Sequence, residues 1–176
     1  MKEKTSARSA GCQLQVQLKN ISNMLAGLYH RGQMGSSPDY QKAVEFSLKA
    51  GELGCAQAYN NLGMYYSKGD GVEVDTKKAS HFFELAAMGG FVNARHNLGW
   101  EEWQKGNKHR AMKHFFIAAK AGSNDSLGVV KYGFEKGLVT KDEYESTLRA
   151  FNERHKEMKS DMRDKAETSN IKGLRF

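Results

Sequence analysis

The feature that most constrains this chain is a motif that recurs at a fixed interval. The trio Asn-Leu-Gly occurs at residues 61–63 and again 36 residues later, each time with an alanine four residues before the leucine. The segments Asp39 to Ala43 and Asp75 to Ala79 are separated by the same interval. Self-similarity at this period indicates a solenoid, in which each small unit buries its apolar face against the next unit. The sequence therefore predicts an array of stacked repeats.

Each repeat has the pattern of two helices joined by a turn. In the first helix Ala58, Leu62 and Tyr66 recur at every fourth position, which places them on one helical face. Gly69 follows as a predicted C-terminal stop, and Asp75 is a predicted N-cap for the second helix. The apolar stripe of the second helix consists of Ala79, Phe82, Phe83 and Ala86, and Gly89-Gly90 ends it. A single hairpin of this kind cannot cover its own apolar face, so several must stack.

The same periodicities define the expected organisation of the whole chain. A shorter third repeat places Phe115 in the position of Phe83, with the tight turn Gly106-Asn107-Lys108 replacing a longer loop. Helices are predicted at residues 18–31, 39–51, 55–68, 76–89, 91–105, 108–121, 124–136 and 140–164. The predicted domains are a flexible segment at 1–17, a repeat array at 18–137, a capping helix at 138–165 and a disordered tail at 166–176. The array is expected to contain about three hairpins followed by one degenerate unit. Thr140 and Glu143 have the spacing of a capping box at the start of the last helix.

The central unit resembles the Sel1-like repeat, a relative of the tetratricopeptide repeat. The residues that carry the resemblance are Ala58, Leu62, Gly63, Tyr66, Gly69, Gly71, Val72, Asp75, Lys78, Ala79, Phe83, Ala86, Ala87 and Gly90. The resemblance implies an all-α fold, a right-handed α-α superhelix of helical hairpins. It also implies a non-enzymatic adaptor or scaffold whose partner is a protein or peptide.

The predicted binding surface is the concave wall formed by the first helix of each repeat. Its candidate residues are Gln57, Asn61, Met64, Asn93, Asn97 and Trp100. Amide side chains can bond an extended peptide backbone, and a tryptophan supplies apolar contact area. One peptide crossing neighbouring repeats would then meet one amide in each. The alternative is that Asn61 and Asn97 bond backbone groups within the solenoid itself.

Enzymatic and metal-binding functions find little support in the sequence. The histidines show no metal-ligand spacing, and the adjacent Glu101 and Glu102 would not face one substrate position from a helix. No cofactor, catalytic residue or metal ligand is therefore predicted. Some cysteine-rich bacterial relatives have been linked to β-lactam hydrolysis, which leaves a hydrolase as the alternative. Those relatives carry paired cysteines in each repeat, whereas this chain has Cys12 and Cys55 alone.

Charge leaves a second alternative open. The net charge is +7, and one basic set consists of Lys105, Lys108, Arg110, Lys113 and Lys120. This set could attract an acidic partner or nucleic acid, although no RNA-binding aromatic motif accompanies it. The last helix alternates acids and bases, which is typical of a solvated surface. No transmembrane segment or secretory signal is expected, the two unpaired thiols suit a reducing compartment, and the predicted location is the cytoplasm or nucleus. The oligomeric state stays open.

Overall fold

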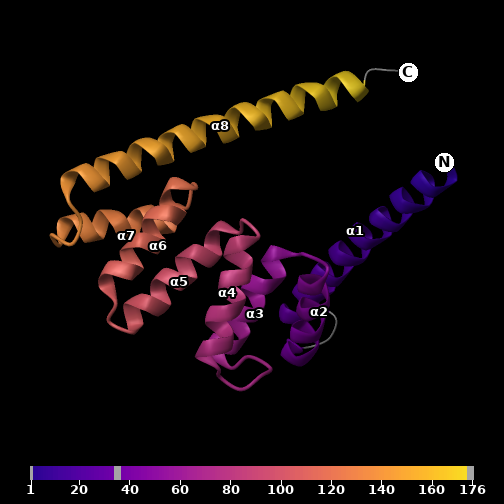
Figure 1. Cartoon of the computed structure of the whole chain (residues 1–176), viewed down its shortest axis with the longest axis horizontal. Helices are drawn as coiled ribbons and strands as arrows, with labels where there is room; N and C mark the ends of the chain where they lie inside the picture. Colours follow the sequence, from indigo (N-terminus) through magenta and orange to yellow (C-terminus); the bar gives the residue numbers. More distant parts are fainter. Residues whose placement is uncertain (1, 34–36, 174–176) are drawn as a thin grey trace. The chain divides into compact units, whose positions relative to one another are not determined.

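A computed structural model describes residues 2–33 and 37–173, with side chains described for residues 13–33 and 37–165. Over these residues the protein consists of eight α-helices and contains no β-strand (Figure 1). The helices are α1 Lys2–His30, α2 Tyr40–Glu52, α3 Ala56–Lys68, α4 Thr76–Met88, α5 Val92–Gln104, α6 Lys108–Lys120, α7 Asn124–Glu135 and α8 Lys141–Gly173. None of the described helices is long and apolar enough to cross a lipid bilayer.

The chain divides into two compact units, Met1–Ala94 and Arg95–Phe176. The boundary lies in the first turn of α5, within the segment that the sequence predicted as one array. Unit 1 holds two helical hairpins, α1 with α2 and α3 with α4, and α2 also packs against α3. In unit 2, helix α6 packs against α7 and α8, and these two helices also contact each other.

The core of unit 1 forms where small residues let two helices approach closely. Ala43, Leu62 and Tyr65 are buried in one cluster that partly buried aromatic side chains cover. At Gly63 a β-carbon would lie only 2.5 Å from Cδ1 of Phe83, so the aromatic ring of α4 rests directly on the backbone of α3. This contact explains why a glycine follows the leucine of the repeat motif, because any side chain would push the hairpin apart.

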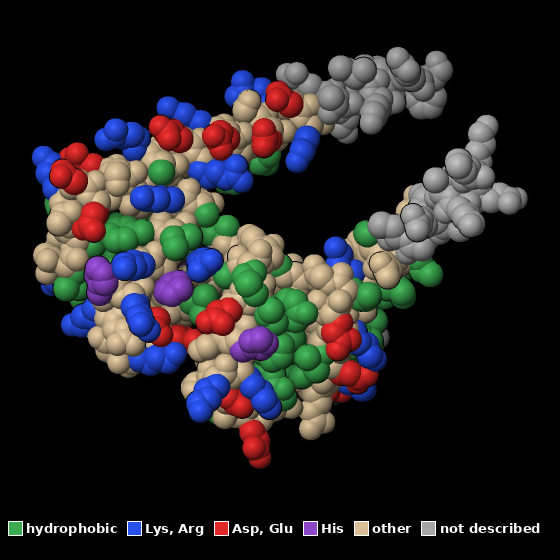
Figure 2. Space-filling view, viewed as in Figure 1, with side chains coloured by type: hydrophobic (Ala, Val, Ile, Leu, Met, Phe, Trp, Pro, Cys, Tyr) green, Lys and Arg blue, Asp and Glu red, His purple; other side chains and the backbone are tan. Residues whose placement is uncertain are grey.

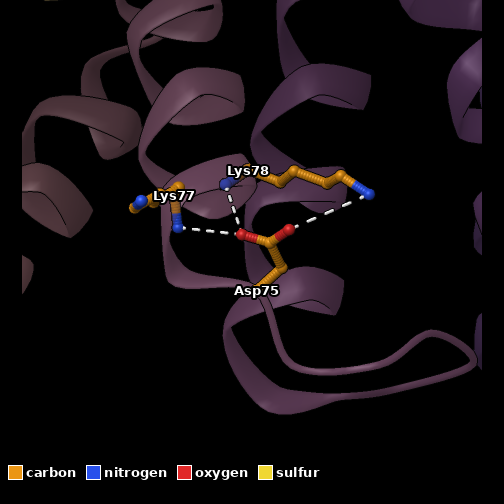
Figure 3. Close-up of polar contacts among 3 residues, drawn as sticks. All are labelled: Asp75, Lys77 and Lys78. Atoms are coloured by element: carbon orange, nitrogen blue, oxygen red, sulfur yellow. Dashed lines mark hydrogen bonds and ion pairs between the residues drawn. The ribbon is translucent and has the colours of Figure 1, made fainter.

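The predicted helix ends are confirmed by their capping contacts. Asp75 precedes α4, and its Oδ1 accepts hydrogen bonds from the backbone N–H groups of Lys77 and Lys78 at 3.1 and 3.0 Å (Figure 3). Its second oxygen lies 3.8 Å from the Lys78 ammonium. Such a cap contributes about 1 kcal/mol. Gly69 ends α3 in the left-handed conformation, with φ 81°, which glycine adopts without steric penalty.

Unit 2 repeats the close helix approach seen in unit 1. Phe115 is fully buried, and a β-carbon at Gly99 would lie 2.7 Å from its Cε1 atom. Met112 and Val130 complete the same core, which Val139 closes near the start of α8. The predicted capping box is also present, since the Thr140 backbone N–H donates to Glu143 Oε2 at 2.9 Å and the Glu143 N–H donates to Thr140 Oγ1 at 3.3 Å.

Six of the predicted helices are confirmed within about one residue at each end, and Leu62 and Leu98 are buried as expected. The first and last helices were predicted too short. Residues 2–17, which the sequence predicted as a flexible N-terminal segment, form the first part of α1, which begins at Lys2. Good helix formers fill this segment, and Leu14 and Leu18 continue the apolar spacing although both are about half exposed.

The last helix likewise continues into the segment 166–176 that was predicted as disordered. Helix α8 ends at Gly173, and residues 174–176 lie outside the described part of the chain. Figure 2 shows acidic and basic side chains interleaved along this helix. Pairs such as Arg154 with Glu157, 3.2 Å apart, stabilise an exposed helix that few tertiary contacts support.

Candidate functional site

A recess of about 360 Å³ opens between α1 and α3 in unit 1. The residues that line it are Asn23, Met24, Gly27, His30, Arg31, Gln57, Asn61, Met64, Tyr65, Lys68 and Asp70. They come from the first helices of two successive hairpins and from the turn after α3. The sequence pattern explains this placement, because the opposite face of α3 carries Ala58 and Leu62, which are buried in the hairpin core.

The lining combines amide groups with sulfur-containing and aromatic side chains. Asn23, Gln57 and Asn61 supply donors and acceptors that match the N–H and C=O groups of an extended peptide. The Asn23 Oδ1 atom is shielded from solvent and has no hydrogen-bond partner among the described residues. A buried oxygen of this kind is stabilised when a donor reaches it. Met64 remains partly exposed and offers an adaptable apolar contact.

The rim of this recess carries more positive than negative charge. Arg31 and Lys68 contribute two cations, and Asp70 contributes one carboxylate. The guanidinium of Arg31 lies against the bare backbone of Gly27, where a β-carbon would be 3.4 Å from it, and its Nε donates to Gln33 at 3.1 Å. This arrangement favours a ligand that carries carbonyl oxygens or a carboxylate.

Unit 2 has a separate pocket of about 470 Å³ between α5 and α7. Its lining consists of Trp100, Trp103, Asp125, Gly128, Val129 and Tyr132. Trp100 is 44% exposed and Tyr132 is 49% exposed, so two large aromatic side chains face solvent within one depression. Large exposed aromatic surfaces of this kind are typical of binding sites.

Trp100 is held in place by a chain of hydrogen bonds. Its indole N–H donates to His96 Nε2 at 2.9 Å, and His96 Nδ1 lies 2.8 Å from Ser126 Oγ. Because Nε2 accepts, the neutral ring must carry its proton on Nδ1 and donate it to Ser126. Burial lowers the pKa of His96, and the nearby charge of Asp125 opposes that shift only in part. The ring is therefore neutral at pH 7, as this network requires.

His96 and Ser126 are not arranged as a catalytic base and its nucleophile. Ser126 is fully buried, so no substrate can reach its hydroxyl group. The second ring nitrogen of His96 accepts from Trp100, so no carboxylate orients the ring as catalysis of this type requires. The pair instead fixes the tryptophan. Among the described residues no cluster of three or more His, Cys, Asp or Glu side chains has the arrangement of a metal site.

The basic set of the third repeat is partly engaged within unit 2. Lys105 lies 3.5 Å from Glu102, and the Lys108 ammonium lies 5.8 Å from the centre of the Trp103 ring. Lys108 and Lys113 also line a smaller groove that contains Glu143. The carboxylates of Glu102 and Glu143 lie beside this basic set and offset part of its positive charge.

A protein-family model matches most of the helical hairpins described above. The Sel1 repeat model matches residues 22–55, 56–91 and 93–123, in register with the three predicted repeats. The chain belongs to the Sel1 repeat family. Helix α7, which the sequence predicted as a degenerate unit, follows the third matched Sel1 repeat.

Known proteins that resemble this chain are also Sel1 repeat proteins. A sel1-like repeat-containing protein of Acanthamoeba polyphaga mimivirus is 33% identical over 63 residues, which are 36% of this chain and 12% of that protein. A Sel1 repeat protein from Oxalobacter formigenes aligns with a TM-score of 0.64 and 22% identity, over 77% of this chain and 58% of that one. The chain thus spans only part of the length of these relatives.

Two further solved structures extend the likeness in fold. The protein c5321, a protective antigen of uropathogenic Escherichia coli with an SLR fold, gives a TM-score of 0.63 at 26% identity over 79% of this chain and 30% of that one. Cysteine rich protein B of Helicobacter pylori gives 0.52 at 23% identity over 68% and 94% of the two chains. The predicted all-α class of helical hairpins is confirmed. Sel1 repeat proteins are in general non-catalytic modules for protein interaction.

The six residues predicted to bind a partner are distributed over the two units, with Gln57, Asn61, Met64 and Asn93 in unit 1 and Asn97 and Trp100 in unit 2. Gln57, Asn61 and Met64 line the recess of unit 1. Trp100 lines the pocket of unit 2. The remaining two predicted amides, Asn93 and Asn97, are not among the described lining residues of either depression.

Of the residues that line the two depressions, the sequence identified three of eleven in unit 1 and one of six in unit 2. In unit 1 the missed side chains include Asn23 of α1 and Arg31, which directly follows that helix. In unit 2 they include Trp103 of α5 together with Asp125 and Tyr132 of α7. Neither α1 nor α7 repeats the Asn-Leu-Gly motif, so the alignment of repeats gave no register for them. The spacing of Asp125, Gly128 and Tyr132 along α7 was the signal available, because it puts all three on one helical face.

Proposed function

We propose that this protein is an adaptor that binds an extended segment of a partner protein in the recess between α1 and α3. The observation that carries the proposal is the meeting of three amide side chains, Asn23, Gln57 and Asn61, from two neighbouring helices in one recess. An extended segment offers a backbone donor and acceptor at every residue, which matches amide groups better than a folded surface does. Membership of a family of interaction modules supports the same function.

The charge of the rim refines the proposed partner segment. Arg31 and Lys68 outnumber Asp70 at the recess, so a segment with acidic residues gains electrostatic attraction. Met24 and Met64, whose side chains are partly exposed, would contact one apolar side chain of that segment. The proposed ligand is therefore an extended peptide with an apolar residue flanked by acidic residues.

The experiment that tests this function is a selection of peptides from a random phage-displayed library, followed by calorimetric titration of the enriched peptides. The double variant Gln57→Ala, Asn61→Ala should weaken binding about tenfold, since each lost hydrogen bond contributes about 0.5–1.5 kcal/mol. Gln41→Ala is the matched control, because it removes an exposed amide of α2 that does not line the recess. Its affinity should equal that of the wild type.

Thermal unfolding separates a loss of binding from a loss of fold. The Gln57 side chain is exposed and Asn61 is half-buried, so their replacement should change the free energy of unfolding by no more than about 0.5 kcal/mol each. If no acidic peptide is enriched, or if the Gln41 variant binds as weakly as the double variant, the recess is not the binding site.

A further inference from the structure

The pocket of unit 2 has a different chemistry from the recess of unit 1. Trp100 and Trp103 lie one turn apart on α5, with ring centres 6.4 Å apart and planes inclined by 69°. Across the pocket, α7 presents Asp125 and Tyr132 on either side of Gly128. A β-carbon at Gly128 would meet no atom within 4 Å, so this glycine leaves the space between the two side chains open. The result is an aromatic depression with a carboxylate at one edge.

The aromatic wall is arranged before any ligand arrives. The Trp100 indole N–H is already bonded to His96, and the ring packs edge-to-face against the buried ring of Phe115, with centres 5.8 Å apart. The polar atom of Trp100 is therefore occupied, and its π surface is what remains for a ligand. Groups held in this way lose little conformational entropy on binding.

The chain's own lysines show which ligand charge these rings attract. The Lys108 ammonium lies 5.8 Å from the centre of the Trp103 ring, and the Lys136 ammonium lies 5.7 Å from that of Tyr132. Both distances are within the range of cation–π attraction. These contacts are at the surface and made by flexible side chains, so they give way readily to a cation that is held more firmly.

Asp125 supplies the complementary charge. Its side chain is exposed in the first turn of α7, and none of the ion pairs among the described residues involves it. A purely apolar ligand would cover this carboxylate without pairing it, at a cost in desolvation free energy. A cation that lies against the aromatic rings and also donates to the carboxylate satisfies both features.

We propose that this pocket binds an arginine side chain of a partner protein. The guanidinium lies on the tryptophan rings and donates to the Asp125 carboxylate, while its methylene groups cover Val129 and Tyr132. Arginine fits better than lysine because its planar head stacks on aromatic faces, pairs with both carboxylate oxygens and is less strongly hydrated. The site is separate from the recess of unit 1, and the proposal does not depend on the function proposed for that recess.

The composition of the chain offers a direct test. The sequence contains only two tryptophans, and both line this pocket. Their two indole N–H resonances can be followed by nitrogen–proton NMR during titration with capped pentapeptides Gly-Ser-Xaa-Ser-Gly. With arginine as Xaa, both resonances should shift and saturate. Lysine should bind several-fold more weakly. Leucine and glutamate should leave the resonances in place.

Three variants connect the shifts to the proposed contacts. Asp125→Asn should lower the affinity for the arginine peptide roughly tenfold, which corresponds to the loss of one charge-assisted contact. Asp142→Asn is the matched control, because it removes an exposed acid from the first turn of α8 and should leave the affinity unchanged. Gly128→Leu should abolish binding by filling the pocket, and the open space at this position lets the helix fold normally.

Two results would overturn the proposal. In the first, none of the peptides shifts the indole resonances at concentrations up to several millimolar. In the second, the leucine peptide binds as well as the arginine peptide and Asp125→Asn has no effect. The second result would identify the pocket as an apolar anchor site.

Discussion

The glycine that follows each repeat leucine should be required for packing, and Gly99→Ala in unit 2 tests this. A β-carbon at this position would lie 2.7, 2.9 and 2.9 Å from three ring atoms of Phe115, well inside ordinary contact distance. The ring is fully buried, and its neighbours include His96 at 5.4 Å and Trp100 at 5.8 Å between centres. It cannot move without displacing them, so the overpacking cost should be in the usual range of about 1–3 kcal/mol.

An opposing effect must be subtracted from this cost. Alanine stabilises a helix interior by about 1 kcal/mol relative to glycine. The added carbon would be too close to three ring atoms rather than one, so the overpacking cost should lie in the upper part of its range. We therefore expect Gly99→Ala to lower the free energy of unfolding by about 1–2 kcal/mol net. Gly128→Ala is the matched control in the same unit, because nothing lies within 4 Å of the added carbon. That variant should be stabilised by up to about 1 kcal/mol.

Urea unfolding followed by tryptophan fluorescence measures both variants, since the two tryptophans belong to unit 2. The dependence on urea concentration should keep its slope, so that the midpoints report stability. In a Phe115→Leu background the cost of Gly99→Ala should disappear. If Gly99→Ala stabilises unit 2 as much as Gly128→Ala does, Gly99 is not required for the close approach of the Phe115 ring to the helix backbone.

Two further predictions concern the cores and the hydrogen-bond chain. Leu62→Ala should cost about 2–5 kcal/mol in thermal or urea unfolding, because the side chain is fully buried; a loss below about 0.5 kcal/mol would contradict its assigned position. The pKa of His96 is lowered from 6.5 by burial, so the unfolded chain binds the extra proton more readily and unit 2 should lose stability as the pH falls below about 6.5. Urea midpoints measured from pH 8 to pH 5 check this, and His96→Gln should flatten the profile; an equally steep profile in that variant would assign the effect to another group.

The repeat motif determined most of the secondary structure before any tertiary information was used. The recurrence of Asn-Leu-Gly and of the capping aspartates Asp39 and Asp75 set the register of the helices, and six of them begin and end within about one residue of the prediction. Such signals are local. An N-cap or a left-handed glycine acts on the turn in which it lies, so its effect can be read from neighbouring residues alone.

The ends of the chain were predicted less well for a related reason. Helices α1 and α8 extend beyond the repeats, where no second copy of the motif confirms or limits them. Their continuation depends on intrinsic propensity and on pairs between neighbouring turns, which are weak signals in a sequence.

The two depressions show what only the tertiary structure decided. The sequence identified Asn61 and Trp100 as exposed members of a repeated face, and both line a depression. It gave no indication that Asn23 would lie beside Asn61, or that Asp125 and Tyr132 would lie opposite the tryptophans. A recess forms between two helices, and its composition depends on which face each helix turns toward the other. That rotation is set by the packing of buried side chains such as Phe115 against the backbone of a neighbouring helix, a contact between residues distant in the sequence.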